Sequence, residues 1–211
     1  QQLRRPPSDE ELAESTGIDI PKLRHTVQSF GRVSSIDRPL DFAAVTDHAE
    51  FLGEQGVCMD PQSPGYNAEF CSVMRSGEGR APAMVMRIMS PFSTRDVDAC
   101  GEDGARCAKY LDQAWQTIVN AAQAHNDTSG NCERTAFIAY EYSSFRLGSN
   151  LHRNVIFRNA TVTDTAISTY DTGSRNVPDL WRQLREQCID AGIGCDVMSI
   201  PHNSNLSRGL M

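Results

Sequence analysis

The stretch LDFAAVTDHAEFLGE, residues 40–54, decides how the rest of the chain is interpreted. Residues 41–46 are mostly apolar and are followed at once by Asp47 and His48. A short apolar run bounded by polar residues is typical of a buried strand. A strand that ends in a carboxylate and an imidazole can deliver both groups to a site. The stretch therefore predicts a strand whose end carries functional side chains.

Further segments repeat this pattern along the chain. Residues 135–144 and 154–162 are rich in aromatic and β-branched side chains, which predicts two neighbouring strands of one sheet. Residues 195–202 predict another strand, and the apolar spacing of residues 177–192 predicts a helix before it. A strand, helix, strand order favours a parallel crossover. We therefore expect an α/β fold, in which helices cover a parallel sheet.

The remaining segments define the expected organisation of the chain. Its length of 211 residues favours a single domain. Residues 1–37 are polar and turn-rich and are expected to form an N-terminal arm or peripheral element. Residues 52–108 are rich in Gly, Pro, Ser and Asp and are too long for a plain connection, so they predict an insertion. Residues 108–124 have apolar side chains at helical spacing and predict an amphipathic helix.

The seven cysteines are spaced so that three short-range disulfides can be drawn. The pairs are Cys58 with Cys71, Cys100 with Cys107, and Cys188 with Cys195, which leaves Cys132 unpaired. The alternative is a set of scattered, reduced thiols, because connectivity does not follow from sequence alone. Disulfides favour an oxidising compartment, so we expect a periplasmic or secreted protein rather than a cytoplasmic one.

Composition excludes two classes of partner. A net charge of −7 and a pI near 5.2 argue against a nucleic-acid polymer, whose phosphates require a basic surface. No apolar run approaches the roughly 18 residues that a membrane helix needs, so no membrane span is expected. The oligomeric state is left open by the sequence.

Imidazole and carboxylate groups occur where the predicted strands begin or end. They are His48, Glu141, His152 and His202. In an α/β barrel the carboxyl ends of the strands open on one face, so these groups are expected to converge. A single His at a strand end is more often structural, but several in matching contexts favour a site. Mixed nitrogen and oxygen ligands suit zinc, manganese or iron. His25 and His125 lack such a context and are interpreted as structural.

Neighbouring polar residues suggest further roles. Asp47 could ligate metal, orient His48, act as a general base or cap a turn, and we favour orientation or general-base catalysis. Arg153 is predicted to contact an anionic substrate, because it adjoins His152 at the mouth of a strand. Asn203 and Asn205 could hydrogen-bond substrate or water, although the same residues are equally suited to a turn.

Four of these segments resemble a known family. DFAAVTDHAEFLGE, residues 41–54, resembles the second motif of the PHP (polymerase and histidinol phosphatase) superfamily. IAYEYSS, NLHRNVIFRN and IPHNSNLSRG resemble a bacterial branch of it, catalogued as domain-of-unknown-function family 3604 and often found on exported proteins. The resemblance implies a distorted β/α barrel that binds two or three divalent metal ions and hydrolyses phosphoesters. It places His48, Glu141, His152 and His202 at metal-ligand positions.

The chain also departs from the superfamily pattern. It contains neither the opening His-x-His motif nor the closing Asp-x-His motif. We therefore expect residues 38–211 to be a partial PHP-like domain from a longer protein, with only part of the barrel strands. The expected function is metal-dependent hydrolysis of a small anionic substrate, most simply a phosphoester. The alternatives are a metal hydrolase of another ester or amide and a non-catalytic binding module.

Overall fold

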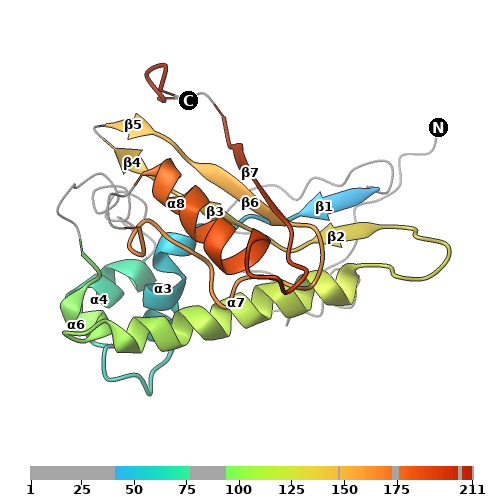
Figure 1. Ribbon diagram of the computed structural model, residues 1–211. Helices are drawn as coiled ribbons and strands as arrows, with labels where there is room; N and C mark the ends of the chain where they lie inside the picture. Colours follow the sequence, from blue (N-terminus) through green and yellow to red (C-terminus); the bar gives the residue numbers. More distant parts are fainter. Residues whose placement is uncertain (1–40, 77–93, 147, 173–175, 204–205, 211) are drawn as a thin grey trace, which may run out of the picture. The chain divides into compact units, whose positions relative to one another are not determined.

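The computed structural model describes residues 41–76, 94–146, 148–172, 176–203 and 206–210, all within one compact unit, Asp41–Met211 (Figure 1). The expected N-terminal arm, His25 and Asn205 lie outside these residues. The described part is a mixed α/β structure, as the sequence predicts at the level of class. No closed barrel is present within the described ranges.

The described strands form separate small sheets, and the first of these is a parallel pair. Strand β1 (Phe42–Ala44) pairs in parallel with β2 (Thr135–Phe137). A single parallel bridge between His48 and Glu141 continues this pairing onto the next strand, β3 (Ala139–Tyr142). The apolar run of the opening stretch is therefore a strand, and its end lies beside β3. The expectation that this strand is buried is wrong, because all of β1 is exposed and Phe42 and Val45 are 66% and 69% exposed.

Strand β3 belongs to a second sheet, which has three strands. β3 pairs antiparallel with β6 (Arg153–Phe157), which pairs antiparallel with β7 (Val197–Pro201). The prediction that β3 and β6 are neighbours is confirmed. Strands β4 (Phe145–Arg146) and β5 (Ser149–Asn150) form a short hairpin between them.

The parallel crossover predicted between residues 154 and 200 is wrong, because β6 and β7 are antiparallel. The loop after β6 already returns the chain to the start of that strand, where the Thr172 hydroxyl meets the Tyr142 hydroxyl at 2.9 Å. Helix α8 (Val177–Leu184) and the π-helical turn η2 (Arg185–Ile189) then carry the chain back again. β7 consequently starts near the end of β6, where Arg158 N donates to Asp196 O.

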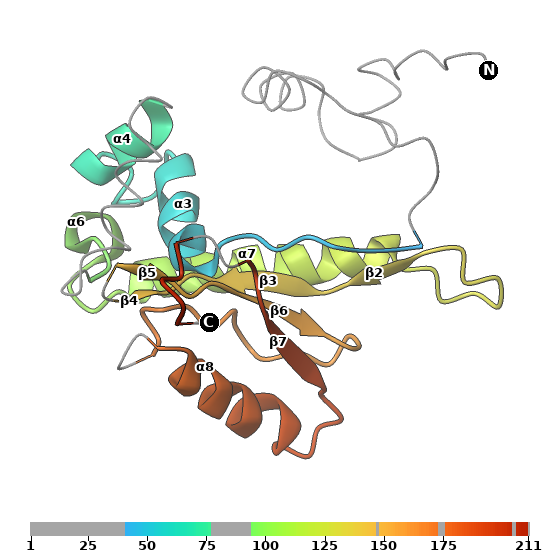
Figure 2. The same ribbon diagram turned by 90° about the horizontal axis from the view of Figure 1, so that it is seen from above.

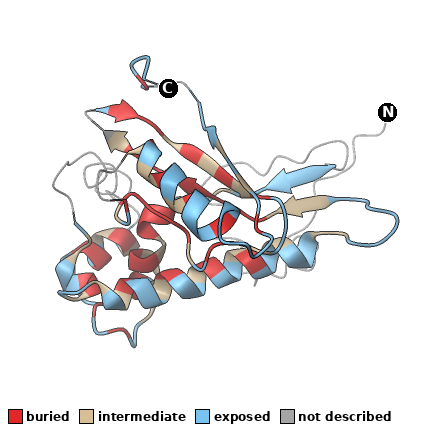
Figure 3. Cartoon of the chain, viewed as in Figure 1, coloured by how far each residue is buried: buried red, intermediate tan, exposed pale blue. Residues whose placement is uncertain are grey.

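The main core lies on one face of the three-stranded sheet. Figure 3 shows buried residues along the strands and helices that form it. Helix α7 (Ala105–His125) confirms the predicted amphipathic helix, and it packs on this face together with α8. Trp115 is fully buried against Tyr140 and Phe157, with ring centroids 5.6 and 5.8 Å away. Its indole N–H donates to Thr163 O at 2.8 Å. The core thus fixes the sheet from one side, and the other side is available for the site.

Within the range predicted to be an insertion, residues 52–76 and 94–108 contribute short helices to a second core. They are α3 (Leu52–Met59), α4 (Glu69–Ser76) and α6 (Val97–Cys100), and Figure 2 shows them grouped near the start of α7. All three predicted disulfides are present, and Cys132 is free and exposed. None of the described helices is both long and apolar enough to span a membrane.

Candidate metal centre

The predicted ligands share the face of the sheet opposite the main core. Directly opposed residues of neighbouring strands lie on the same face, as do alternate residues of one strand. Glu141 opposes Asn154, and Asn154 opposes Ile200. His152 and His202 are each two residues from a member of this row, so they extend from the same face. His48 bridges to Glu141 at the remaining edge.

Strand direction explains why the groups also meet at one end of the sheet. β3 and β7 both run antiparallel to β6, so they end where β6 begins. The segment after β1 runs parallel to β3, and His48 in this segment bridges to Glu141. His48, Glu141 and His202 therefore come from the ends of strands, whereas His152 immediately precedes one. A mixed sheet thus achieves the convergence that the sequence reasoning attributed to parallel strands.

Glu141 is the centre of the cluster. Its Oε1 lies 2.6 Å from His152 Nδ1 and 3.6 Å from His48 Nδ1, and its Oε2 lies 3.7 Å from His202 Nε2. The ring centroid of His152 is 5.6 Å from that of His48 and 6.3 Å from that of His202. Glu141 is buried, but the side chain of His48 is 49% exposed. The carboxylate is therefore shielded within a cluster that solvent can reach.

Burial and charge act in opposite directions on these groups. Burial lowers the pKa of His48, and the neighbouring Glu141 carboxylate only partly offsets this. Burial tends to raise the pKa of Glu141, but the hydrogen bond with His152 and the three imidazoles together bring it below its usual value. Both shifts favour a neutral imidazole and an ionised carboxylate, which are the forms that bind metal.

Ser143 and Glu50 support the cluster through a chain of hydrogen bonds that reaches His48. The Ser143 hydroxyl is hydrogen-bonded to His48 Nδ1 at 2.5 Å. The Ser143 amide donates to Glu50 Oε1 at 2.8 Å, and the Thr169 amide donates to the same oxygen at 3.4 Å. Glu50 is fully buried in the turn η1 (Ala49–Phe51), and burial raises its pKa to about 7.

Sequence reasoning missed Ser143 and Glu50. Ser143 stands two residues after Glu141, so strand alternation could have placed it on the ligand face. Glu50 stands two residues after His48 in the opening motif, but it lies in a helical turn, so no such periodicity marks it. Only the fold brings it to Ser143.

Asp47 and the predicted asparagines are placed differently. The Asp47 carbonyl accepts the Glu141 amide at 2.8 Å. Asp47 also lines an apolar groove of about 380 Å³, together with Ala43, Val45 and part of α7. This groove lies on the side of β1 away from His48. Asn203 is exposed, and its side-chain amide contacts His202 Nδ1. Asp47 therefore positions Glu141 through its main chain.

Arg153 does not join the ligands. It alternates with His152 and Asn154 along β6, so it lies on the core face with Val155 and Phe157. It is 6% exposed, and its Nη1 donates to His152 O at 2.9 Å. Burial lowers the pKa of this guanidinium. In the described structure Arg153 braces the His152 main chain.

The comparisons with known proteins identify the family. The model of a family described as "Protein of unknown function (DUF3604)" matches residues 22–211. The chain belongs to the DUF3604 family. No curated protein and no solved structure matches it. The DUF3604 match covers all four predicted ligands and confirms the resemblance to that family.

The donor set of this DUF3604 chain fits a divalent metal ion. Ligand atoms of His48, Glu141 and His152 all lie within 4.8 Å of one another, and His202 approaches the second oxygen of Glu141. Imidazole nitrogen with carboxylate oxygen suits zinc, manganese or iron. Because the two oxygens of Glu141 face different imidazoles, one carboxylate can contribute to two ion positions.

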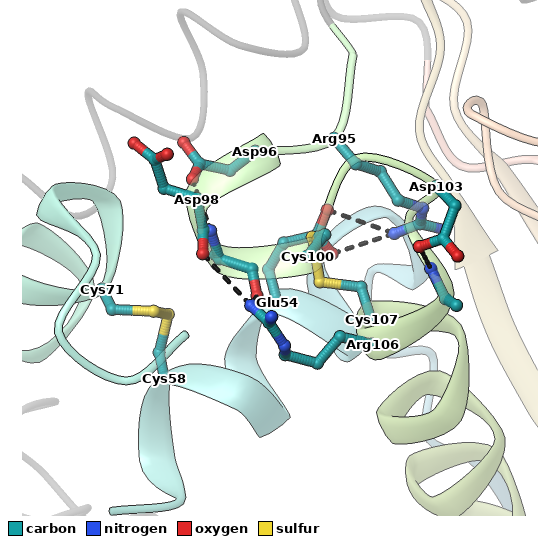
Figure 4. Close-up of a disulfide and its surroundings, with 12 residues drawn as sticks. Glu54, Cys58, Cys71, Arg95, Asp96, Asp98, Cys100, Asp103, Arg106 and Cys107 are labelled. Atoms are coloured by element: carbon teal, nitrogen blue, oxygen red, sulfur yellow. Dashed lines mark hydrogen bonds and ion pairs between the residues drawn. A yellow bond between two sulfur atoms is a disulfide. The ribbon is translucent and has the colours of Figure 1, made fainter. Parts of the chain in front are cut away.

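A second group of potential ligands in the DUF3604 chain has a structural role. Glu54, Cys100 and Cys107 also lie close together, but the two sulfurs form a disulfide (Figure 4). The Glu54 carboxylate accepts hydrogen bonds of 3.1 and 2.9 Å from Arg95 Nη1. With its thiols oxidised and its carboxylate paired, this group fixes the insertion helices and offers no metal site.

Proposed function

We propose that this chain is a metal-dependent hydrolase that acts on a small anionic ester, most simply a phosphoester. His48, Glu141, His152 and His202 would hold two or three divalent ions of zinc, manganese or iron. The observation that carries this proposal is the approach of three imidazoles, from separate segments, to both oxygens of one buried carboxylate.

When bound, such ions lower the pKa of a coordinated water towards neutrality and polarise a phosphoryl oxygen. The protein's own contribution is to hold the donor atoms in place. The Ser143 hydroxyl fixes the ring of His48, and the Asp47 carbonyl fixes the main chain of Glu141. Preorganised groups of this kind avoid reorganisation when charge develops on the substrate.

The surroundings of the cluster suggest how substrate is handled. Half of the His48 side chain is exposed, so a substrate can approach from solvent. Asn203 lies beside His202 on this open side and is our candidate for a substrate hydrogen bond. General-base catalysis by Asp47 and substrate binding by Arg153 stay predictions, and their positions favour structural support instead.

The type of reaction, the barrel fold and the location of the protein are part of the same proposal. The resemblance to the PHP superfamily supports phosphoester hydrolysis and a distorted β/α barrel. The three disulfides support an oxidising location, periplasmic or secreted.

A panel of chromogenic phosphate, sulfate and carboxylic esters tests the proposal. Each is assayed with added zinc, manganese or iron, using the wild-type chain, His152→Ala and Glu141→Gln, and His125→Ala as an exposed histidine control. We expect metal-dependent hydrolysis of the phosphate ester. His152→Ala and Glu141→Gln should each reduce it by at least about 100-fold, because losing even a group that supports a metal ligand can cost about that much. Phosphate as the poorest substrate would indicate another esterase. A metal-loaded protein without hydrolysis would indicate a binding module.

A further inference from the structure

Asn154 occupies the middle of the ligand face. It is directly opposite Glu141 on β3 and directly opposite Ile200 on β7. Cross-strand neighbours of this kind have Cβ atoms about 5 Å apart. His152 precedes it by two residues on the same strand, and His202 follows Ile200 by two. Glu141, His152 and His202 are therefore all neighbours of Asn154 on this face of the sheet.

The Asn154 side chain has an unsatisfied oxygen. Its Oδ1 is buried from solvent and has no hydrogen-bond partner among the residues that the structure describes. A buried polar atom without a partner destabilises a folded protein, so such atoms are uncommon and call for an explanation. A cation bound next to Glu141 and His152, on the face of the sheet that carries Asn154, is a candidate partner for this oxygen.

We propose that Asn154 supplies an additional oxygen ligand to the metal cluster. This inference rests on the proposed function, because it assumes that the cluster binds metal. An amide carbonyl is a neutral, hard oxygen donor, so it adds a ligand without adding charge beside Glu141. The motif His152-Arg153-Asn154 then has a divided role: alternate residues ligate metal, and the arginine between them braces the strand from the core face.

The opposite orientation of the amide makes a different prediction. If the nitrogen faced the cluster, Asn154 would donate a hydrogen bond to the Glu141 carboxylate. Replacement by Asp would then set two carboxylates against each other and weaken metal binding. If the oxygen faces the cluster as a ligand, Asp preserves it. The effect of Asn154→Asp on metal binding thus distinguishes a metal-binding oxygen from an amide that donates a hydrogen bond to Glu141.

Metal affinity measured on the folded chain tests the proposal. Zn²⁺ binding is followed by competition with a chromophoric chelator for the wild type, Asn154→Leu, Asn154→Asp, Glu141→Gln and the exposed helix control Asn120→Leu. We expect Asn154→Leu to weaken binding by at least about tenfold, in the range found for groups that support metal sites. We expect Asn154→Asp to bind at least as tightly as the wild type. Thermal unfolding of each metal-free variant checks that it is folded.

The outcomes separate this inference from the function it rests on. Wild-type affinity in Asn154→Leu, or an equal loss in the Leu and Asp variants, would overturn the ligand role while leaving the cluster intact. A wild type that binds no Zn²⁺, or a Glu141→Gln variant that binds like the wild type, would instead overturn the metal centre itself. Asn120→Leu is expected to match the wild type in every case.

Discussion

Glu50 should make the metal-free protein less stable as the pH rises from about 4.5 to 7. Its pKa is raised from 4.5 to about 7 by burial. Between these values the folded protein keeps a proton that the unfolded chain has released, so unfolding releases it and becomes easier at higher pH. The stabilising effect is complete below pH 4.5 and is lost as the pH passes 7. At about 1.4 kcal/mol per pH unit, the change is about 3 kcal/mol.

The contribution of Glu50 is isolated by comparing the wild type with Glu50→Gln. The glutamine keeps an oxygen that accepts the Ser143 amide but does not titrate. Urea unfolding with a chelator, followed by tryptophan fluorescence, gives the free energy of unfolding at several pH values. We expect the difference between the two proteins to change by about 3 kcal/mol across the interval, whereas the exposed control Glu186→Gln should show no such change. If the free energy of unfolding changed with pH by the same amount in the wild type and in Glu50→Gln, the reasoning would be refuted.

Two further predictions concern the insertion, both measured by urea unfolding. Gly53→Ala should destabilise the fold by about 1–3 kcal/mol, because its Cβ would lie 2.3 Å from the Cys107 carbonyl oxygen. Gly130→Ala, whose Cβ would meet nothing within 4 Å, should change stability by less than about 0.5 kcal/mol; equal effects would contradict the packing argument. Arg95→Gln should destabilise the fold by about 3–5 kcal/mol, since it removes the guanidinium that forms an ion pair with the buried Glu54 carboxylate. Adding Glu54→Gln should recover much of that loss, and no recovery would argue against the ion pair.

Local patterns predicted the elements that depend on local physics. The apolar spacing of α7 and the aromatic content of β3 and β6 reflect the faces they bury, so these elements were predictable without a fold. The short cysteine separations allowed three disulfides to be drawn, and all three are present.

Long-range geometry was less accessible. The direction of β7 depends on the path of the loop after β6, which has no periodic pattern to reveal it. The link from Ser143 to His48 joins residues 95 apart, and that from Ser143 to Glu50 joins residues 93 apart. Arg153 is a different case. Its position next to His152 at the strand mouth favoured a substrate contact, which stays a prediction, and the structure places its side chain on the core face of β6.

The most direct test of the metal centre is the metal content of the purified, full-length chain, determined by elemental analysis. The account predicts near-stoichiometric zinc, manganese or iron in the wild type and in His125→Ala. It predicts that His48→Ala and Glu141→Ala lose most of that metal while remaining folded. A folded wild-type protein that carries no metal and takes up none when it is supplied would contradict the account.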